Sequence, residues 1–245
     1  ASAALLGLLV GCGLGAEPVQ DDGPTGVDRT GPTTGAPDLP DAPDRPDLPD
    51  VTALPGETVT VDLDGRPFRL HVPTGYDDSG PAALVVGLHG YTSRSEELDS
   101  YLGLTAASDE RAFLLALPEG ETNDAGDRYW NAVPGGCCDF YGAGTDDVEY
   151  LSRLLSTVQD SYDVDRVALV GHSNGGCLGP RVAGGRAPGG GGLAPPAGPL
   201  PVPPAACRPA RPVTVLHAHG DADELVLFGG SAQGGWASAP DTAAT

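Results

Sequence analysis

Short apolar runs that each end at a glycine turn are the feature that most constrains the fold of this chain. Runs of this length without polar alternation are typical of strands buried on both faces of a parallel sheet. They cover residues 83–88, 112–117, 166–170 and 213–218. Upstream, an alternating pattern at 58–63, an Asp64-Gly65 turn and a second run at 68–72 predict a β-hairpin.

Helical stretches separate these runs, and the clearest of them begins at Thr145. Asp146 and Asp147 stand in its first turn, where carboxylates interact favourably with the helix N-terminus. The apolar residues that follow fall on one face: Val148, Leu151, Leu154, Leu155 and Val158. This alternation predicts an α/β fold, with a mostly parallel, doubly wound sheet and helices on both faces. Reactive residues of such sheets lie at the carboxyl ends of the strands.

The segment from Gly171 to Gly175 follows the run 166–170 and reads Gly-x-Ser-x-Gly. This pattern is typical of a nucleophile elbow, in which a serine sits on a sharp strand-to-helix turn. Bulky neighbours would collide in so tight a turn, and Gly171 and Gly175 provide room around Ser173. We predict that Ser173 is a catalytic nucleophile. The alternative is a strand-to-helix turn without catalytic function.

The end of an earlier strand carries residues that fit the same chemistry. The turn after residues 83–88 reads His89-Gly90-Tyr91, and in this architecture that loop supplies an oxyanion donor. We therefore assign the backbone N–H groups of Tyr91 and Asn174 to the oxyanion hole. We expect a structural role for His89, because it precedes the nucleophile in the chain.

An acidic residue is expected after the run 213–218, where it would orient a catalytic histidine. Asp223 is the predicted acid and Asp221 is the reserve, and the alternative for both is a solvated loop carboxylate. In this fold the order along the chain is serine, acid, histidine. No histidine follows Asp223 in the sequence, and a serine without a base is a poor nucleophile.

The histidines of the sequence all precede Asp223: His71, His89, His172, His217 and His219. His172 projects from the same tight turn as Ser173 and is poorly placed to act as its base. His217 lies within a predicted strand. His219, at the end of that strand, stays open as a candidate.

Net charge limits the partners of the chain. Acidic residues number 34 against 13 basic ones, which gives a formal net charge of −21. Nucleic acids and anionic membrane surfaces both favour proteins with a basic face. We therefore expect no nucleic-acid partner and no electrostatic attraction to a membrane surface.

Residues 1–12 form an apolar stretch that is too short for a bilayer span of about 20 residues and is typical of a partial signal peptide. The four residues from Leu9 to Cys12 resemble the lipobox of bacterial lipoproteins, in which the cysteine thiol takes a lipid. Cys12 is therefore a predicted lipidation site, and the alternative is an ordinary secretory signal. In both cases we expect an exported protein, in which disulfides are permitted.

Residues 13–55 are rich in Asp, Pro, Gly and Thr. Proline blocks helices and sheet ladders, and the repeated aspartates repel one another, so little of this segment can be buried. We predict a disordered linker over 13–55 and a folded domain over 56–245.

Several motifs together resemble the secreted poly(3-hydroxybutyrate) depolymerases and their feruloyl and acetylxylan esterase relatives, in the α/β-hydrolase superfamily. These motifs are, in order, residues 88–90, 128–132, 137–142, 146–151, 171–176 and 216–220. The resemblance implies an α/β-hydrolase fold, a Ser-Asp-His triad and hydrolysis of carboxylic esters. By matching position it implies Ser173 as the nucleophile and Asp223 as the acid.

The chain departs from these relatives at two places. They carry the catalytic histidine further along, so the resemblance implies that the domain is truncated at its C-terminus before that histidine. They also have a helix where this chain has Gly184 to Gly192. Glycine costs a helix about 1 kcal/mol per position and proline about 3, so we predict no stable helix there. A short out-of-frame read is one hypothesis for this stretch, and a genuine sequence is the other.

With Cys12 lipidated, the candidates for disulfides are Cys137, Cys138, Cys177 and Cys207. Four cysteines allow three pairings. A bridge between the adjacent Cys137 and Cys138 would be strained, so we expect each to pair elsewhere. A two-cysteine metal site is the alternative, but no histidine lies at ligand spacing, and we expect no metal and no organic cofactor.

The sequence therefore predicts a serine esterase that is secreted or lipid-anchored at a bacterial surface. Its expected substrate is an extracellular polyester, and the alternative is the feruloyl or acetyl esters of plant polysaccharide. A second alternative is a catalytically inactive surface lipoprotein that keeps the fold as a binding module. Tyr129 and Trp130 could line a substrate cleft or pack in the core.

Overall fold

A computed structural model of the chain describes residues 10–11, 48–132, 138, 142–184, 190–194, 214–231 and 238–239. The chain divides into two units, one of residues 1–12 with 49–245 and one of residues 13–48. Most of the second unit, and with it most of the predicted linker, lies outside the described residues. The predicted signal peptide also lies outside them, except for Val10–Gly11.

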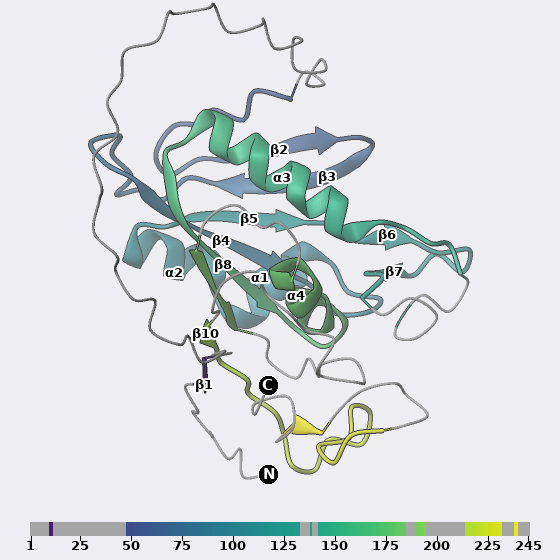
Figure 1. Ribbon diagram of the computed structural model, residues 1–245. Helices are drawn as coiled ribbons and strands as arrows, with labels where there is room; N and C mark the ends of the chain where they lie inside the picture. The colour runs from purple at the N-terminus through teal and green to yellow at the C-terminus, as the bar shows by residue number, and fades with distance from the viewer. Residues whose placement is uncertain are drawn as a thin grey trace, which may run out of the picture. The chain divides into compact units, whose positions relative to one another are not determined.

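The larger unit is built on an eight-stranded sheet in the order β1-β10-β9-β8-β4-β5-β3-β2 (Figure 1). Its strands are β1 (Val10–Gly11), β2 (Thr58–Leu63), β3 (Arg66–His71), β4 (Ala82–Leu88), β5 (Leu114–Pro118), β8 (Val164–Gly171), β9 (Gly190–Ala194) and β10 (Thr214–Val215). A two-stranded sheet of β6 (Glu121–Thr122) and β7 (Arg128–Tyr129) stands apart from it. The helices are α1 (Ser95–Leu102), α2 (Leu104–Arg111), α3 (Asp147–Ser161) and α4 (Asn174–Gly184).

The centre of the sheet is parallel, because β4 pairs in parallel with both β5 and β8, and β8 pairs in parallel with β9. Strands β2 and β3 form the predicted hairpin, and β3 joins the parallel strands in antiparallel orientation to β5. Asp64 and Gly65 turn the hairpin with positive φ angles of 59° and 81°. The sheet is therefore mixed and mostly parallel, with antiparallel pairing at its edges.

Helices cover both faces of the sheet, as the alternation of β5 shows. Its residues Leu115 and Leu117 pack with Leu98 of α1 and Leu104 of α2. The core on the other face holds Leu114 and Ala116 of β5 together with residues of α3 and α4: Leu151, Leu154, Leu155, Val158, Leu178 and Val182. This two-sided arrangement around a mostly parallel sheet confirms the predicted α/β class and is consistent with the predicted α/β-hydrolase fold.

The amino end of α3 begins slightly later than predicted. Asp146 caps the helix, because its side chain accepts a hydrogen bond of 3.0 Å from the N–H of Glu149. Asp147 is the first helical residue, and its side chain is completely buried.

The packed domain also begins earlier than predicted. Val51 is 1% exposed and belongs to the core. The N–H of Ala53 donates a hydrogen bond of 2.8 Å to the hydroxyl of Tyr162 at the end of α3. The expected boundary at residue 56 therefore falls inside the packed unit. A single apolar residue in a proline-rich stretch gave no periodic signal of its burial.

Cys177 does not form the disulfide for which it was a candidate. It is a free thiol within α4, is 4% exposed, and has its pKa raised to about 12 by burial. The helical face on which it lies packs into the core, so its thiol serves as a small apolar group. The sulfur of Cys138 is bonded in a disulfide whose partner lies outside the described residues. Cys137 and Cys207 lie there too.

Part of the glycine-rich stretch from Gly184 to Gly192 is extended. Helix α4 ends at Gly184, and β9 begins at Gly190 and pairs in parallel with β8. Residues 185–189 lie outside the described part of the chain. Among the described residues, no helix combines the length and apolarity needed to cross a membrane.

A buried ion pair connects the hairpin to α3. The Arg66 Nη1 atom lies 2.7 Å from Asp147 Oδ1, and the guanidinium stacks 3.8 Å from the centroid of the Tyr150 ring. Burial raises the pKa of Asp147, while the neighbouring Arg66 opposes that shift. Each partner thus compensates for the desolvation of the other.

Asp147→Ala is expected to lower the free energy of unfolding by about 3–5 kcal/mol, because it leaves a buried guanidinium without its partner. Arg166→Ala is the control, since its pair with Asp165 is exposed and is expected to contribute less than about 1 kcal/mol. Urea unfolding followed by tryptophan fluorescence measures both. Equal losses for the two variants would contradict the role given to Asp147.

Candidate active site

Ser173 stands between the end of β8 and the start of α4 (Figure 1). Its φ of 51° places it in the left-handed region, which non-glycine residues rarely adopt at a cost of about 1–3 kcal/mol. The carbonyl of Ser173 accepts the N–H of Cys177 at 3.1 Å, which starts the helix. This is the backbone geometry of a nucleophile elbow.

The elbow is packed so closely against β4 that side chains are excluded beside it. A β-carbon added to Gly171 would lie 2.5 Å from the carbonyl carbon of Gly175. A β-carbon added to Gly175 would lie 2.6 Å from the carbonyl oxygen of His89. The steric requirement for both glycines, which the sequence pattern predicted, is confirmed.

The loop after β4 runs directly past the elbow. The N–H of His172 donates to the carbonyl of Leu88 at 3.0 Å, and a β-carbon added to Gly90 would lie 3.6 Å from the Ser173 Cβ. The loop is also held from its other side, because the Tyr91 hydroxyl donates to Asp127 Oδ2 at 3.0 Å. Tyr91 and Asn174 thus belong to two backbone segments in contact, while their roles as oxyanion donors stay predictions.

His89 is a structural residue, as expected. It is completely buried, its Nδ1 donates to the Gly90 carbonyl at 2.7 Å, and its Nε2 accepts the N–H of Gly120 at 2.9 Å. Burial lowers the pKa of His89, so the ring is neutral despite Glu119 Oε2 at 3.7 Å. A neutral ring with both nitrogens bonded to backbone fixes the loop and is not free to accept a proton from substrate.

Asn174 takes part in an interaction that the sequence did not reveal. Its Oδ1 accepts the backbone N–H of Trp130 at 2.7 Å, and its Nδ2 donates to the carbonyl of Trp130 at 2.9 Å. The Trp130 indole in turn donates to the carbonyl of His89 at 2.9 Å. Tyr129 and Trp130 are 1% and 0% exposed, so they pack in the core.

The next residue, Asn131, ties the same segment to α3. Its backbone N–H donates to Asp147 Oδ2 at 2.6 Å, and its side-chain amide donates to the carbonyl of Thr145 at 2.9 Å. Arg181 of α4 donates to the carbonyl of Asn131. Trp130 and Asn131 belong to the motif at residues 128–132, which was the part of the sequence that pointed to this segment.

Neither His71 nor His172 contacts the Ser173 hydroxyl as a general base would. His71 Nε2 lies 3.1 Å from Asp109 Oδ1, and its Nδ1 lies 2.9 Å from the Thr58 hydroxyl. His71 is on β3, which β4 and β5 separate from β8 and the elbow. The His172 ring meets the Tyr101 ring edge-on, with centroids 5.6 Å apart. Within the described part of the chain, no hydrogen bond joins the Ser173 hydroxyl to any histidine.

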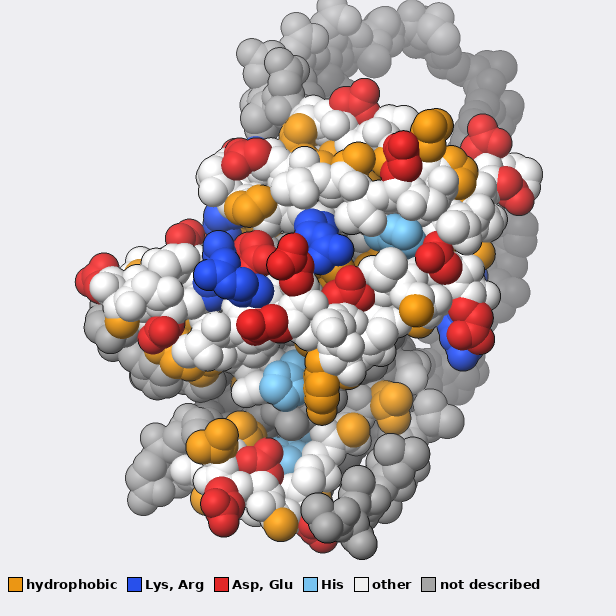
Figure 2. All heavy atoms as spheres, turned by 180° about the vertical axis from the view of Figure 1, so that it is seen from behind, with side chains coloured by type: hydrophobic (Ala, Val, Ile, Leu, Met, Phe, Trp, Pro, Cys, Tyr) orange, Lys and Arg blue, Asp and Glu red, His pale blue; other side chains and the backbone are white. Residues whose placement is uncertain are grey.

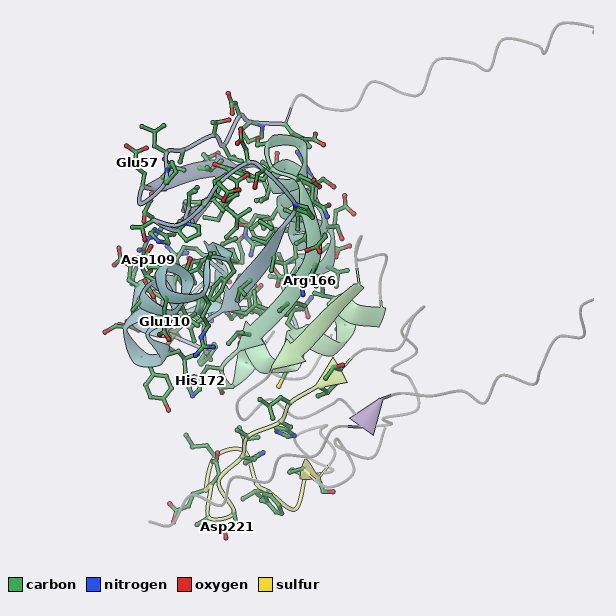
Figure 3. The ribbon with its side chains drawn as sticks, turned by 90° about the vertical axis from the view of Figure 1, so that its left-hand side faces the viewer. Glu57, Asp109, Glu110, Arg166, His172 and Asp221 are labelled. Carbon is green, nitrogen blue, oxygen red and sulfur yellow. The ribbon has the colours of Figure 1, made fainter. Side chains whose placement is uncertain are left out.

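Asp223 lies in the segment that follows β10, and its side chain is fixed by its own loop. Its Oδ1 accepts the N–H groups of Leu225 and Val226, both at 2.9 Å. Its Oδ2 lies 3.7 Å from His219 Nε2, which donates to the Val226 carbonyl at 2.7 Å. Asp221 is exposed at the turn that precedes it (Figure 3). No described contact joins either carboxylate to Ser173.

Acidic side chains are spread over the face seen in Figure 2, and basic side chains gather mainly in one cluster among carboxylates. Arg128 Nε lies 3.3 Å from Glu119 Oε2. Among the described residues, no three His, Cys, Asp or Glu side chains are grouped as metal ligands.

The chain matches no protein-family model. It is 35% identical over 170 residues to "Putative esterase NocK" of Nocardia uniformis subsp. tsuyamanensis, a match that covers 67% of this chain and 47% of that protein. It is 23% identical over 185 residues to "Bifunctional acetylxylan esterase/xylanase XynS20E" of Neocallimastix patriciarum, with 67% of this chain and 22% of that protein covered. The chain thus spans less than half the length of either relative.

Among solved structures, the chain is similar to LpqC, a poly(3-hydroxybutyrate) depolymerase from Bordetella parapertussis. The identity is 20% and the TM-score is 0.40, with 58% of this chain and 53% of that chain covered. A likeness at this level carries no argument about function.

Gly175→Ala is expected to lower the free energy of unfolding by more than about 3 kcal/mol, because the new β-carbon meets rigid backbone where ordinary overpacking costs 1–3. Gly80→Ala is the matched control, since it has no heavy atom within 4 Å and should change stability by less than about 0.5 kcal/mol. Thermal and urea unfolding compare the two. A Gly175→Ala protein as stable as the control would refute the close packing of the elbow.

Burial lowers the pKa of His217 to about 4, and the adjacent His219 ring acts in the same direction. The unfolded chain therefore binds this proton more readily than the folded protein does, so stability from this residue is lost as pH falls from about 6.5 towards 4. Between pH 7 and pH 5, His217→Gln should lose less stability than the unmodified chain in urea unfolding. An identical loss would show that His217 is solvated in the folded protein.

Proposed function

We propose that this chain carries the nucleophile of a serine esterase that hydrolyses carboxylic esters through an acyl-enzyme. The observation that carries the proposal is Ser173 in the left-handed region at the end of β8, beside the loop that follows β4. This arrangement exposes a hydroxyl next to two backbone segments whose N–H groups can hold an oxyanion. The 35% identity to a relative described as an esterase supports it.

The reaction would begin with attack of Ser173 Oγ on the ester carbonyl carbon. The new C–O bond forms while the hydroxyl proton passes to a histidine base, and the carbonyl oxygen becomes an oxyanion held by the N–H groups of Tyr91 and Asn174. Collapse of this intermediate breaks the ester C–O bond, and the histidine gives its proton to the leaving alcohol. Water then attacks the acyl-enzyme by the same steps and releases the acid.

Asp223 is proposed as the acid that orients the histidine. The fixed position of its Oδ1 leaves Oδ2 as the oxygen that can accept a proton-bearing ring nitrogen. The histidine itself is proposed to be none of the five in this sequence. His71, His89 and His219 are hydrogen-bonded to other groups, and the His172 ring packs against Tyr101. The His217 ring packs against His219, and no described contact joins it to Ser173.

The substrate is proposed to be a polyester of the poly(3-hydroxybutyrate) type. The alternative substrates are feruloyl or acetyl esters on plant polysaccharide, and the second relative, described as an acetylxylan esterase and xylanase, favours the acetyl ester. The same proposal includes export of the protein, lipidation at Cys12 and an extracellular or cell-surface location. It also includes disulfide pairing among Cys137, Cys138 and Cys207.

A second candidate function is a binding module without catalysis. It rests on the described geometry, in which no histidine is hydrogen-bonded to Ser173. Turnover of any simple ester that depends on Ser173 distinguishes the two candidates.

In the protein that carries the proposed histidine base, Ser173→Ala is expected to lower kcat/KM for p-nitrophenyl butyrate by about 10⁴-fold or more, because it removes the nucleophile of the acyl-enzyme route. Ser152→Ala is the control, since its hydroxyl bonds to the carbonyl of Val148 on α3 and lies outside the proposed site. Rates of p-nitrophenol release from both variants and the parent measure the effect. Equal rates for Ser173→Ala and the parent would leave the binding module as the function.

A further inference from the structure

We propose that the side chain of Asn174 is a positioning residue for the oxyanion hole. It would act by holding its own backbone N–H in place through its bonds to Trp130. This inference rests on the proposed function, because it concerns the transition state of that reaction. The inference extends the proposed function by assigning a role to the side chain of Asn174, which contacts no reacting atom.

The contact is a two-point clamp between one amide side chain and one backbone residue. Asn174 accepts the N–H of Trp130 and donates to the carbonyl of Trp130, so both groups of the side chain are satisfied by the same residue. Two hydrogen bonds fix the side-chain torsions, which attach directly to the Asn174 backbone. With only one of these hydrogen bonds, the side-chain amide of Asn174 could still rotate about that bond.

The clamp lies in a dry environment. Asn174 and Trp130 are both 0% exposed. Hydrogen bonds are stronger where the local dielectric is low, and a buried group that loses its partner carries the full cost of desolvation. The side chain of Asn174 therefore has no alternative partner in water, and its orientation is set.

Trp130 is itself held from several directions, so the clamp has a rigid base. Its indole N–H donates to the carbonyl of His89, at the start of the loop that carries Tyr91. The following residue donates its N–H to Asp147, which pairs with Arg66. Trp130 thus connects to both backbone segments from which the oxyanion donors are proposed to come.

Positioning of this kind acts on the rate. An oxyanion donor contributes most when it is aimed at the place where charge develops, and removal of one donor lowers kcat by about 10²–10³-fold. A displacement of about 1 Å in such a group can cost about 10²-fold. A loosened Asn174 peptide should therefore lower kcat and leave KM nearly unchanged.

Asn174→Asp, made in the protein that carries the proposed histidine base, is the test, because it keeps the shape and the acceptor oxygen but places a carboxylate oxygen against the Trp130 carbonyl. At pH 8 we expect kcat for p-nitrophenyl butyrate to fall about 10²-fold, with KM within about twofold of the parent. As pH falls, the introduced carboxyl takes up a proton and can donate again. The ratio of parent kcat to variant kcat should therefore narrow by about tenfold between pH 8 and pH 5.5.

Two further variants keep the test decisive. Thr157→Val removes a buried side-chain bond to the carbonyl of Arg153 in α3 and should lower stability without changing kcat. Trp130→Phe keeps the clamp and loses the hydrogen bond from the indole to the carbonyl of His89. This variant should lower kcat, and its ratio of parent kcat to variant kcat should not narrow at low pH.

The failures of the two proposals are distinct. A parent protein that hydrolyses the ester, together with a folded Asn174→Asp protein whose kcat is unchanged or whose loss is independent of pH, would overturn the positioning role alone. A rise in KM without a fall in kcat would overturn it too. A folded parent that carries the proposed histidine base and shows no Ser173-dependent hydrolysis would overturn the proposed function, and the positioning role with it.

Discussion

The close approach of the amino end of α4 to the carboxyl end of β4 is the constraint on which the site depends. Gly175 lies against the carbonyls of Leu88 and His89, where no β-carbon fits. The loop after β4 lies beside Ser173, whose φ of 51° is in the left-handed region. The energy stored in that turn is of the order of 1–3 kcal/mol and has to be offset by the packing of the surrounding sheet.

Buried polar contacts hold this arrangement in one conformation. Arg66, Trp130, Asp147 and Asn174 come from distant parts of the chain, yet each satisfies another across the face of the sheet on which α3 and α4 pack. Such a network is stabilising where its groups are paired, and it penalises any rearrangement that breaks a pair. Hydrophobic packing of the strands and helices is non-directional, so the polar contacts define the geometry near Ser173.

The sequence patterns predicted those features of the fold and site that depend on residues close together in the chain. The hairpin at Asp64-Gly65, the buried strands β4 and β8, the amphipathic α3 and the glycine requirement around Ser173 all follow from short stretches of sequence. The bond between Trp130 and Asn174 joins residues 44 positions apart, and the packing of Ala53 on Tyr162 joins residues 109 apart. No periodicity or turn signal encodes such pairings, and the free thiol of Cys177 is likewise decided by what packs around α4.

The most direct measurement of the proposed chemistry is reaction of the protein with a fluorophosphonate, followed by intact mass and peptide mapping. If Ser173 is activated, its oxygen displaces fluoride from phosphorus, and the protein gains one phosphonyl group on the peptide that contains Ser173. Prior unfolding in urea should abolish that adduct, because activation depends on the folded elbow. A folded protein that carries the proposed histidine base and stays unlabelled, or that carries the group on another residue, would contradict the assignment of Ser173 as the nucleophile.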